Sequence, residues 1–251
     1  ASIFGNKRTA SIMMKFELQA KNFQNDEPKP KSRSVMEDSQ NNQTNALNGS
    51  DLIPAGRDAS ATAPSPVLLP KLLLGSSSPR RSQILEMIGW PFEVGAVEVD
   101  ESLRDDESPR EYVARLADAK AQAAGAVHSH RPIVAADTTV VVDEHILAKP
   151  ADSEDARRML RLLQGRWHQV LTGVALISDS AREVDVEMTE VRFAPMSNAE
   201  IAWYVETGEP MDKAGAYAIQ GKGARFIEGI KGDYFNVMGL PVRLLYDLIR
   251  R

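Results

Sequence analysis

The chain contains no cysteine among its 251 residues. This absence excludes disulfide bonds, thiolate zinc sites, iron–sulfur clusters and a cysteine nucleophile, and it is compatible with a reducing compartment. Histidine is also scarce, and the four histidines are scattered along the chain, at positions 128, 130, 145 and 168. A metal site built from histidines is therefore not expected.

Long apolar runs and an excess of positive charge are missing as well. No run approaches the roughly 18 apolar residues that a membrane-spanning helix needs, so we expect no membrane association. The net charge is −5, which argues against general binding to nucleic acid, although a local basic cleft is compatible with an acidic whole.

The first 66 residues differ in composition from the rest. Between Lys21 and Pro66, 22 of the 46 residues are Asn, Gln, Ser, Thr or Pro, and Phe23 is the only aromatic residue. Such a segment buries too little apolar surface to offset its ordering entropy. We therefore predict a disordered extension over residues 1–66 and one globular domain over residues 67–251. For residues 1–20 a targeting peptide is the alternative to a plain extension. The extension is favoured because the segment is not Arg-rich, contains Glu17 and has no clean cleavage pattern.

The domain combines strand and helix signals. Its clearest helix starts are the capping boxes at Ser108–Glu111 and Ser197–Glu200. Helices are expected to begin near residues 79, 109, 153, 198 and 241, and strands are expected over residues 71–75, 92–97, 133–142, 170–177, 184–193, 225–230 and 234–237. Because alternating strands and helices occur together with hairpins, we predict an α/β domain with a mixed twisted sheet and flanking helices.

Residues 75–81 connect a predicted strand to a helix start through a turn of small residues, which include Ser76 and Ser78. Free backbone N–H groups and the helix dipole favour an anion at such a place. Arg80 and Arg81 oppose the dipole unless a phosphate or carboxylate compensates their charge. The alternative is a capped helix with surface arginines. The Gly-Lys-Ser/Thr ending of a Walker loop is missing.

A polar triplet, Asp137-Thr138-Thr139, interrupts the apolar strand predicted over residues 133–142. A carboxylate in such a strand is costly to bury without a charged or metal partner. Asp137 is therefore a candidate general base or metal ligand. The alternative is a strand-end aspartate that accepts hydrogen bonds from backbone amides.

Other candidates are weaker when taken singly. Glu101 in an acidic loop, Lys120 in a predicted helix and Lys149 after a predicted hairpin are equally compatible with a solvated surface. The stretch of residues 212–223 is rich in Gly and Ala, and its Gln220 has a donor and an acceptor suited to a base edge. A flexible turn is the alternative there. Together these segments suggest a cleft for a polyanion, with one or two carboxylates for a divalent cation.

Taken in order, the motifs resemble the Maf family of nucleoside triphosphate pyrophosphatases. The resemblance covers about residues 67–251 and rests on the segments Ser76–Arg81, Val99–Ser102, Ala119–Ala121, Ala136–Thr138, Ala148–Pro150, Gly215–Gly221 and Gly239–Pro241. It implies hydrolysis of a nucleoside triphosphate to the monophosphate and pyrophosphate in a long nucleotide cleft, on a fold related to the inosine triphosphate pyrophosphatases. It also implies a cytoplasmic location and the use of a divalent metal cation, Mg²⁺ or Mn²⁺. Members of the family are often homodimers.

The resemblance also implies roles for individual residues. Asp137 would be the catalytic base that activates water, and Glu101 would help to hold the metal. The phosphates would be bound by a set of basic and hydroxyl side chains: Ser76, Ser78, Arg81, Lys120 and Lys149.

The family has branches that prefer different nucleotides, and the branch for dTTP and UTP carries Arg, Thr and Gln at three positions. This chain has Arg80, Thr138 and Gln220, and so it resembles the branch that prefers dTTP and UTP. The other branch, which prefers 7-methyl-GTP, has Trp at the position of Arg80 and Glu at that of Gln220. A modified pyrimidine nucleotide is an alternative substrate within the first branch.

Two other functions remain open from the sequence. A nucleotidyltransferase also places a small-residue loop with arginine after its first strand, and it would release pyrophosphate only with a sugar phosphate or alcohol acceptor. A nucleotide-binding regulator of cell division would bind nucleotide tightly with little turnover.

Overall fold

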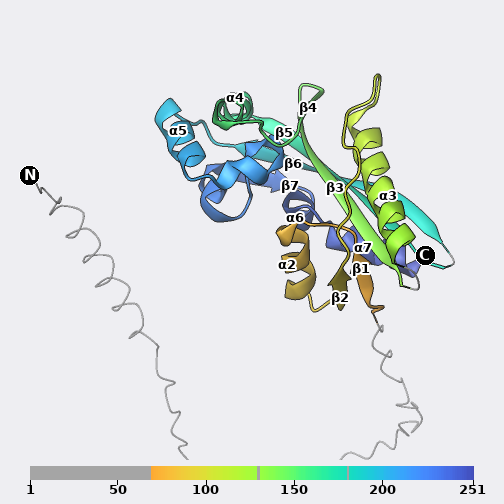
Figure 1. The fold of residues 1–251 in the computed structure, drawn as a ribbon. Coiled ribbons are helices and arrows are strands. Elements are labelled where there is room, and N and C mark those ends of the chain that lie inside the picture. Colours follow the sequence, from red (N-terminus) through yellow and green to blue (C-terminus); the bar gives the residue numbers. More distant parts are fainter. Residues whose placement is uncertain (1–68, 129–130, 180) are drawn as a thin grey trace, which may run out of the picture. The chain divides into compact units, whose positions relative to one another are not determined.

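The computed structural model describes residues 69–128, 131–179 and 181–251. The predicted disordered extension and its boundary with the domain at residues 66 and 67 lie outside these ranges. A seven-stranded sheet runs through the described domain, in the order β2-β1-β3-β5-β6-β7 with β4 paired to β3 (Figure 1). The strands are β1 (Leu72–Leu74), β2 (Phe92–Val94), β3 (Ile133–Val142), β4 (His145–Leu147), β5 (Trp167–Ile177), β6 (Arg182–Phe193) and β7 (Ile227–Lys231).

The sheet is mixed. Strand β1 pairs in parallel with β2 and β3, whereas every other neighbouring pair is antiparallel. Strands β5 and β6 form the predicted hairpin but are longer than predicted, with Trp167 paired to Arg192 and Ile177 to Arg182. The predicted α/β fold with a mixed sheet is therefore confirmed.

Six α-helices and three short 3₁₀ helices flank the sheet in the described residues (Figure 1). The α-helices are α2 (Pro79–Met87), α3 (Pro109–Val127), α4 (Ser153–Leu163), α5 (Asn198–Glu206), α6 (Tyr234–Met238) and α7 (Val242–Arg250); the 3₁₀ helices are η1 (Glu209–Asp212), η2 (Ala214–Ala216) and η3 (Gly221–Phe226). Both predicted capping boxes are present, at Ser108 before α3 and at Ser197 before α5. No helix in the described ranges is long and apolar enough to cross a membrane.

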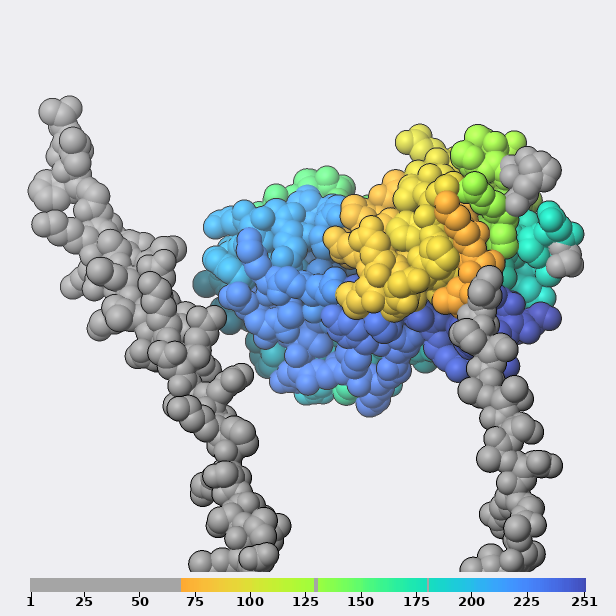
Figure 2. Space-filling model, turned by 90° about the horizontal axis from the view of Figure 1, so that it is seen from below, coloured from red at the N-terminus to blue at the C-terminus, as the bar shows by residue number. Residues whose placement is uncertain are grey.

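Alternation along β3 divides the core between the two faces of the sheet. Ile133 and Ala135 pack in the cluster that includes alanines of α3, whereas Val134 and Ala136 pack in the cluster formed with α2, α6 and α7. Figure 2 shows the orange-to-yellow surface of the segment that contains α2 lying against the blue C-terminal part of the chain. On the α3 side, Gly173 of β5 lets the helix approach closely, since a Cβ there would lie 2.3 Å from the Val113 carbonyl oxygen.

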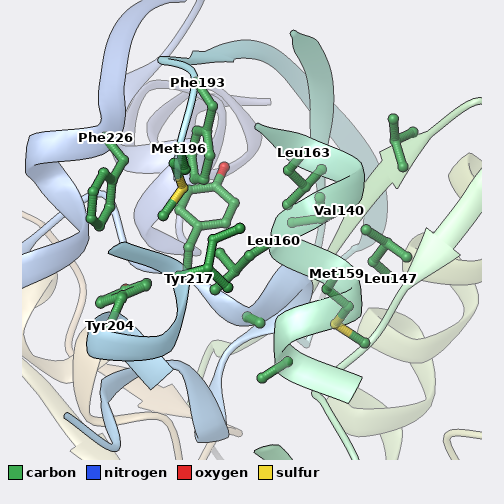
Figure 3. Packing of buried hydrophobic residues seen from close by; sticks show 14 of the residues in the cluster. Val140, Leu147, Met159, Leu160, Leu163, Phe193, Met196, Tyr204, Tyr217 and Phe226 are labelled. Carbon is green, nitrogen blue, oxygen red and sulfur yellow. The ribbon is translucent and has the colours of Figure 1, made fainter. Parts of the chain in front are cut away.

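A further core cluster joins α4 and α5 to the far part of the sheet (Figure 3). Its largest fully buried side chains include Tyr204 and Phe193. Tyr217 packs edge-on against Phe193, with ring centroids 4.7 Å apart, and the hydroxyl of Tyr217 lies 2.8 Å from Nε2 of His168. This cluster supports the connections that run from η1 to η3.

Two strand predictions were wrong. Residues 234–237 belong to helix α6, because the Asp233 side chain accepts a hydrogen bond from the Phe235 amide and Gly239, with φ +112°, ends the helix. The second strand ends at Val94 instead of Val97, because its partner β1 ends at Leu74 and the last bond of the pair runs from the Gly95 amide to the Leu74 carbonyl.

Candidate active site

One cleft of about 680 Å³ is lined by all ten residues that the sequence singled out. These are Ser76, Ser78, Arg80, Arg81, Glu101, Lys120, Asp137, Thr138, Lys149 and Gln220. They come from the loop after β1, from α2, the acidic loop, α3, β3, the segment after β4 and the segment before η3. Residues that are up to 144 positions apart in sequence, Ser76 and Gln220, thus face a common space.

Lys120 is the centre of a buried ionic cluster. Its ammonium lies 2.6 Å from Oδ1 of Asp137 and 2.6 Å from Oε1 of Glu101. Lys120 and Asp137 are each 8% exposed, so their charges are held in a poorly solvated place. Side chains alternate between the two faces of β3, and Asp137 therefore lies on the same face as Ile133 and Ala135, which α3 covers. This explains why Asp137 contacts Lys120 of α3.

The acidic loop before α3 is tied down so that Glu101 faces the cleft. Tyr112 donates a hydrogen bond from its hydroxyl to the Glu101 carbonyl, 3.0 Å away. Arg115 binds the Ser102 carbonyl at 3.0 Å and pairs with the Glu107 carboxylate. Glu101 itself keeps half of its side chain exposed, at 51%, and it is therefore the solvent-facing member of the cluster.

Burial and charge act in opposite directions on the two carboxyl groups. For Asp137, burial dominates and raises the pKa, although the charges of Lys120 and Arg81 oppose this shift. For Glu101, burial also acts to raise the pKa, but the hydrogen bond and charge of Lys120 outweigh it and lower the pKa. Burial, together with the charges of Asp137 and Glu101, raises the pKa of the Tyr112 hydroxyl to about 12, so this hydroxyl stays protonated.

Arg81 connects three segments at the floor of the cleft. Its guanidinium donates to Oγ of Ser76 at 2.9 Å, to Oγ1 of Thr138 at 3.2 Å and to the Gly239 carbonyl at 2.8 Å. Burial lowers the pKa of Arg81, but an arginine remains charged after such a shift. Arg81 is therefore both a cation in the cleft and a structural tie between β1, β3 and the end of α6.

The hydroxyl of Thr138 has a defined direction. Thr172 donates to the Asn236 carbonyl at 3.2 Å, so its only hydroxyl proton is used there. In the 3.0 Å contact between Thr138 and Thr172, Thr138 must then be the donor. With Arg81 donating to the same oxygen, Thr138 can offer a ligand only an acceptor lone pair.

A second wall of the cleft carries Gln220 and, from residues 212–219, all but Gly215 and Ala216. Arg80 reaches this wall, because its guanidinium lies 3.3 Å from the carboxylate of Asp212. Asp212 in turn pairs with Lys213 at 2.5 Å. The cleft therefore has an ionic side around Lys120 and a second side that carries Gln220, with Arg80 between them.

Two carboxylates of the cleft are candidates for holding a divalent cation. Among the described residues, no group of three or more His, Cys, Asp or Glu side chains is arranged to hold a metal ion. Glu101 and Asp137 nevertheless converge on one ammonium, which places both within reach of a single cation. Mg²⁺ is commonly held by one or two carboxylates and completes its octahedron with water and substrate phosphate oxygens.

Sequence reasoning missed several residues that support the site. Tyr112, Thr172 and Asn236 were not singled out, although Tyr112 and Thr172 hold site residues directly and Asn236 provides the acceptor for Thr172. Their contacts are non-local, so their neighbours in sequence carry no signal for them. A polar residue inside an apolar run, such as Thr172 in β5, was the one available hint.

Comparison with known proteins gives consistent matches. The family model described as "Maf-like protein" matches residues 71–251. A protein of Symbiobacterium thermophilum named dTTP/UTP pyrophosphatase is 53% identical over 179 residues, which cover 71% of this chain and 92% of that protein. One of Koribacter versatilis with the same name is 48% identical over 180 residues, 72% of this chain and 93% of that protein. The solved structure of the Staphylococcus aureus Ham1 protein is 14% identical, covers 72% of this chain and 98% of its own, and has a TM-score of 0.41. With the family model covering most of its length and with these close relatives, the chain belongs to the Maf-like family.

Proposed function

We propose that this protein hydrolyses dTTP and UTP to the nucleoside monophosphate and pyrophosphate. The observation that carries the proposal is the buried Asp137 carboxylate, held by Lys120 in a cleft that also contains Arg81, Lys149 and Arg80. A polyanionic substrate supplies the negative charge that such a set of cations lacks. The names of the close relatives support the same substrates.

Asp137 is the proposed general base. It accepts a proton from a water molecule that attacks the α-phosphorus, while the bond from this phosphorus to the bridging oxygen breaks and pyrophosphate leaves. A raised pKa brings a carboxylate closer to the basicity that proton abstraction requires. Lys120 keeps the carboxylate oriented, since it binds one of its two oxygens.

The cations of the cleft are proposed to bind the phosphates. Lys120, Arg81 and Lys149 stabilise the charge that develops on the leaving pyrophosphate, and each such contact contributes roughly 10²-fold in rate. Ser76 and Ser78 line the loop around the phosphate chain. A divalent cation held by Glu101 would neutralise charge on the phosphate oxygens when bound.

Base selection is assigned to Arg80, Thr138 and Gln220. Thr138 presents an acceptor, which suits the imide N–H of thymine or uracil. Gln220 presents one donor and one acceptor, which suits the same imide edge.

The test is pyrophosphate release by the purified protein with Mg²⁺ or Mn²⁺, using dTTP, UTP, CTP, dITP and 7-methyl-GTP, with the products identified. In water enriched in ¹⁸O, attack at the α-phosphorus places the label in the monophosphate. Release from dTTP and UTP without an acceptor, with labelled monophosphate, is the expected result. Label in pyrophosphate, dependence on an acceptor alcohol, or tight nucleotide binding without turnover would each overturn the proposal.

A further inference from the structure

Glu209 supports the cleft from behind its lining. It is not among the lining residues, and none of the sequence motifs includes it. It begins η1, directly after Gly208 and three residues beyond the last residue of α5, and its side chain is half-buried. Its carboxylate accepts three hydrogen bonds of 2.9 Å each: from the hydroxyl of Tyr204, from the amide of Lys222 and from the amide of Gly223. Two of these donors are backbone amides two and three positions beyond Gln220.

The same network holds the chain on the other side of Gln220. The hydroxyl of Tyr204 donates to Glu209 and accepts a hydrogen bond from the amide of Ala218, at 3.2 Å. The segment is therefore fixed at Ala218 and again at Lys222, with Gln220 midway between the two points. Tyr204 is itself fully buried and packs against Phe226, with ring centroids 5.6 Å apart (Figure 3).

Two glycines make this close approach feasible. A Cβ at Gly221, whose φ is +74°, would lie 2.6 Å from Oε2 of Glu209. A Cβ at Gly223 would lie 2.5 Å from both the Tyr204 hydroxyl and the Ala218 carbonyl oxygen. Glycine at both positions thus allows one carboxylate to be wrapped by backbone, in the way that an anion is bound by successive amides.

The charge of Glu209 suits this role. Burial acts to raise its pKa, but the hydrogen bonds from Lys222, Gly223 and Tyr204 together with the charge of Lys213 outweigh burial and lower it. Glu209 is therefore ionised at neutral pH and accepts hydrogen bonds with both oxygens. Its backbone carbonyl also binds the ammonium of Lys213, at 2.8 Å, which links it to the Asp212 and Arg80 pairing across the cleft.

We propose that Glu209 is a positioning residue that sets where Gln220 meets the nucleobase, so that pyrimidine selectivity depends on a carboxylate that does not touch the substrate. This inference rests on the proposed function. It separates base selection from phosphate chemistry, because the Glu209 network reaches Gln220 but makes no contact with Asp137 or Lys120 among the hydrogen bonds of the described domain.

The test is the Glu209→Gln variant. A carboxylate accepts hydrogen bonds with both oxygens, but the glutamine amide accepts with only one, so the variant cannot keep all three bonds from Tyr204, Lys222 and Gly223. We expect kcat/KM for dTTP to fall about 10- to 100-fold, mainly through KM, since the lost bonds go to a charged acceptor. Inhibition by pyrophosphate, which lacks a base, should stay at the wild-type level. Glu206→Gln, an exposed glutamate three residues earlier on α5, is the matched control and should retain wild-type kinetics.

A double-mutant cycle with Gln220→Ala shows whether Glu209 acts through Gln220. In the Gln220→Ala background, Glu209→Gln should cost little further, because the residue it positions is gone. Additive losses, an equal loss for all nucleotides, or unchanged kinetics in Glu209→Gln would overturn the inference. Should Glu209→Gln fail to fold, Tyr204→Phe removes one arm of the network, and the same criteria apply with a smaller loss. Absence of turnover in the wild-type protein would instead contradict the proposed function.

Discussion

The two sides of the cleft are built in different ways. On the ionic side, Asp137 and Lys120 project from a long strand and a long helix and neutralise each other over 2.6 Å. On the other side, Gln220 sits between two short 3₁₀ helices and is held through backbone amides that converge on Glu209. Rigid regular elements thus carry Asp137 and its partner Lys120, whereas an irregular segment with one anchoring carboxylate carries the amide of Gln220.

This difference suggests a division of labour. A phosphate chain is the same in every nucleoside triphosphate, so groups that handle it can be fixed on the strands and helices of the fold. The base differs between substrates, and a loop held by a few backbone bonds can change its residues without disturbing the sheet. Substitutions on the ionic side should therefore lower turnover of all substrates, and substitutions on the Gln220 side should change the choice among them.

The largest effect is expected for Asp137→Asn. An amide cannot accept the proton from water, so turnover should fall roughly 10³-fold for every nucleotide, while the fold is kept because the side chain retains its size. Pyrophosphate release and a thermal melt measure the two effects. Asp118→Asn, on α3 and paired with Arg182 outside the cleft lining, is the control. Wild-type turnover in Asp137→Asn would rule Asp137 out as the base.

The support beneath the Gln220 side should be sensitive to acid. Burial lowers the pKa of His168 from 6.5 to about 3, with a smaller contribution from the charge of Arg166. The folded state therefore keeps His168 neutral while the unfolded state takes up a proton below pH 6.5, so the free energy of unfolding should fall as pH drops from 6.5 toward 3. Between pH 6.5 and pH 3 this protonation should lower the free energy of unfolding by roughly 4 to 5 kcal/mol.

Denaturant unfolding at a series of pH values measures this dependence. His168→Gln keeps a polar partner for Tyr217 but does not titrate, so its stability should depend less on pH than that of the wild type. Equal slopes for the two proteins over this range would show that His168 is not the group responsible.

Lys120→Met should weaken the ionic side without removing the base. The variant loses a cation near the phosphates and leaves Asp137 without its closest partner, so kcat/KM should fall about 10²-fold for all nucleotides. Stability should fall as well, because a buried carboxylate loses its counter-ion. Lys71→Met, which removes a surface pair with Glu93, provides the comparison. A loss restricted to one base would be inconsistent with a role at the phosphates.

The smallest effect is expected for Gln220→Glu. A carboxylate accepts hydrogen bonds but does not donate, so the variant loses the bond to a pyrimidine carbonyl oxygen and should lower dTTP and UTP turnover about 10-fold more than 7-methyl-GTP turnover. Steady-state kinetics on the three nucleotides measures this ratio. Equal losses would remove Gln220 from base selection.

Local patterns in the sequence predicted much of this molecule. The two capping boxes specify α3 and α5 through bonds within four residues, and the β-branched run over residues 133–142 matches β3. The ordered motifs predicted that Ser76 and Gln220 belong to one cleft, and both residues line it. The wrong prediction for residues 234–237 shows the limit of such patterns. Four mostly apolar residues fit the period of a strand and that of a helix equally well, and the Asp233 cap makes the segment a helix.

The supporting residues were beyond the reach of the sequence. Glu209 acts on Lys222 and Gly223 through backbone amides, which have no residue type to recognise. The direction of the Thr138 hydroxyl depends on Thr172 and the Asn236 carbonyl, which lie 34 and 98 positions further along the chain. Such long-range hydrogen bonds follow from the folded sheet.

The most direct test of the division between the two sides is the ratio of kcat/KM for dTTP to that for 7-methyl-GTP, measured in Lys120→Met and in Gln220→Glu. We expect Lys120→Met to lower both values in parallel and leave the ratio as in the wild type, and Gln220→Glu to reduce the ratio about 10-fold. A changed ratio in Lys120→Met, or an unchanged one in Gln220→Glu, would contradict the separation of phosphate chemistry from base selection.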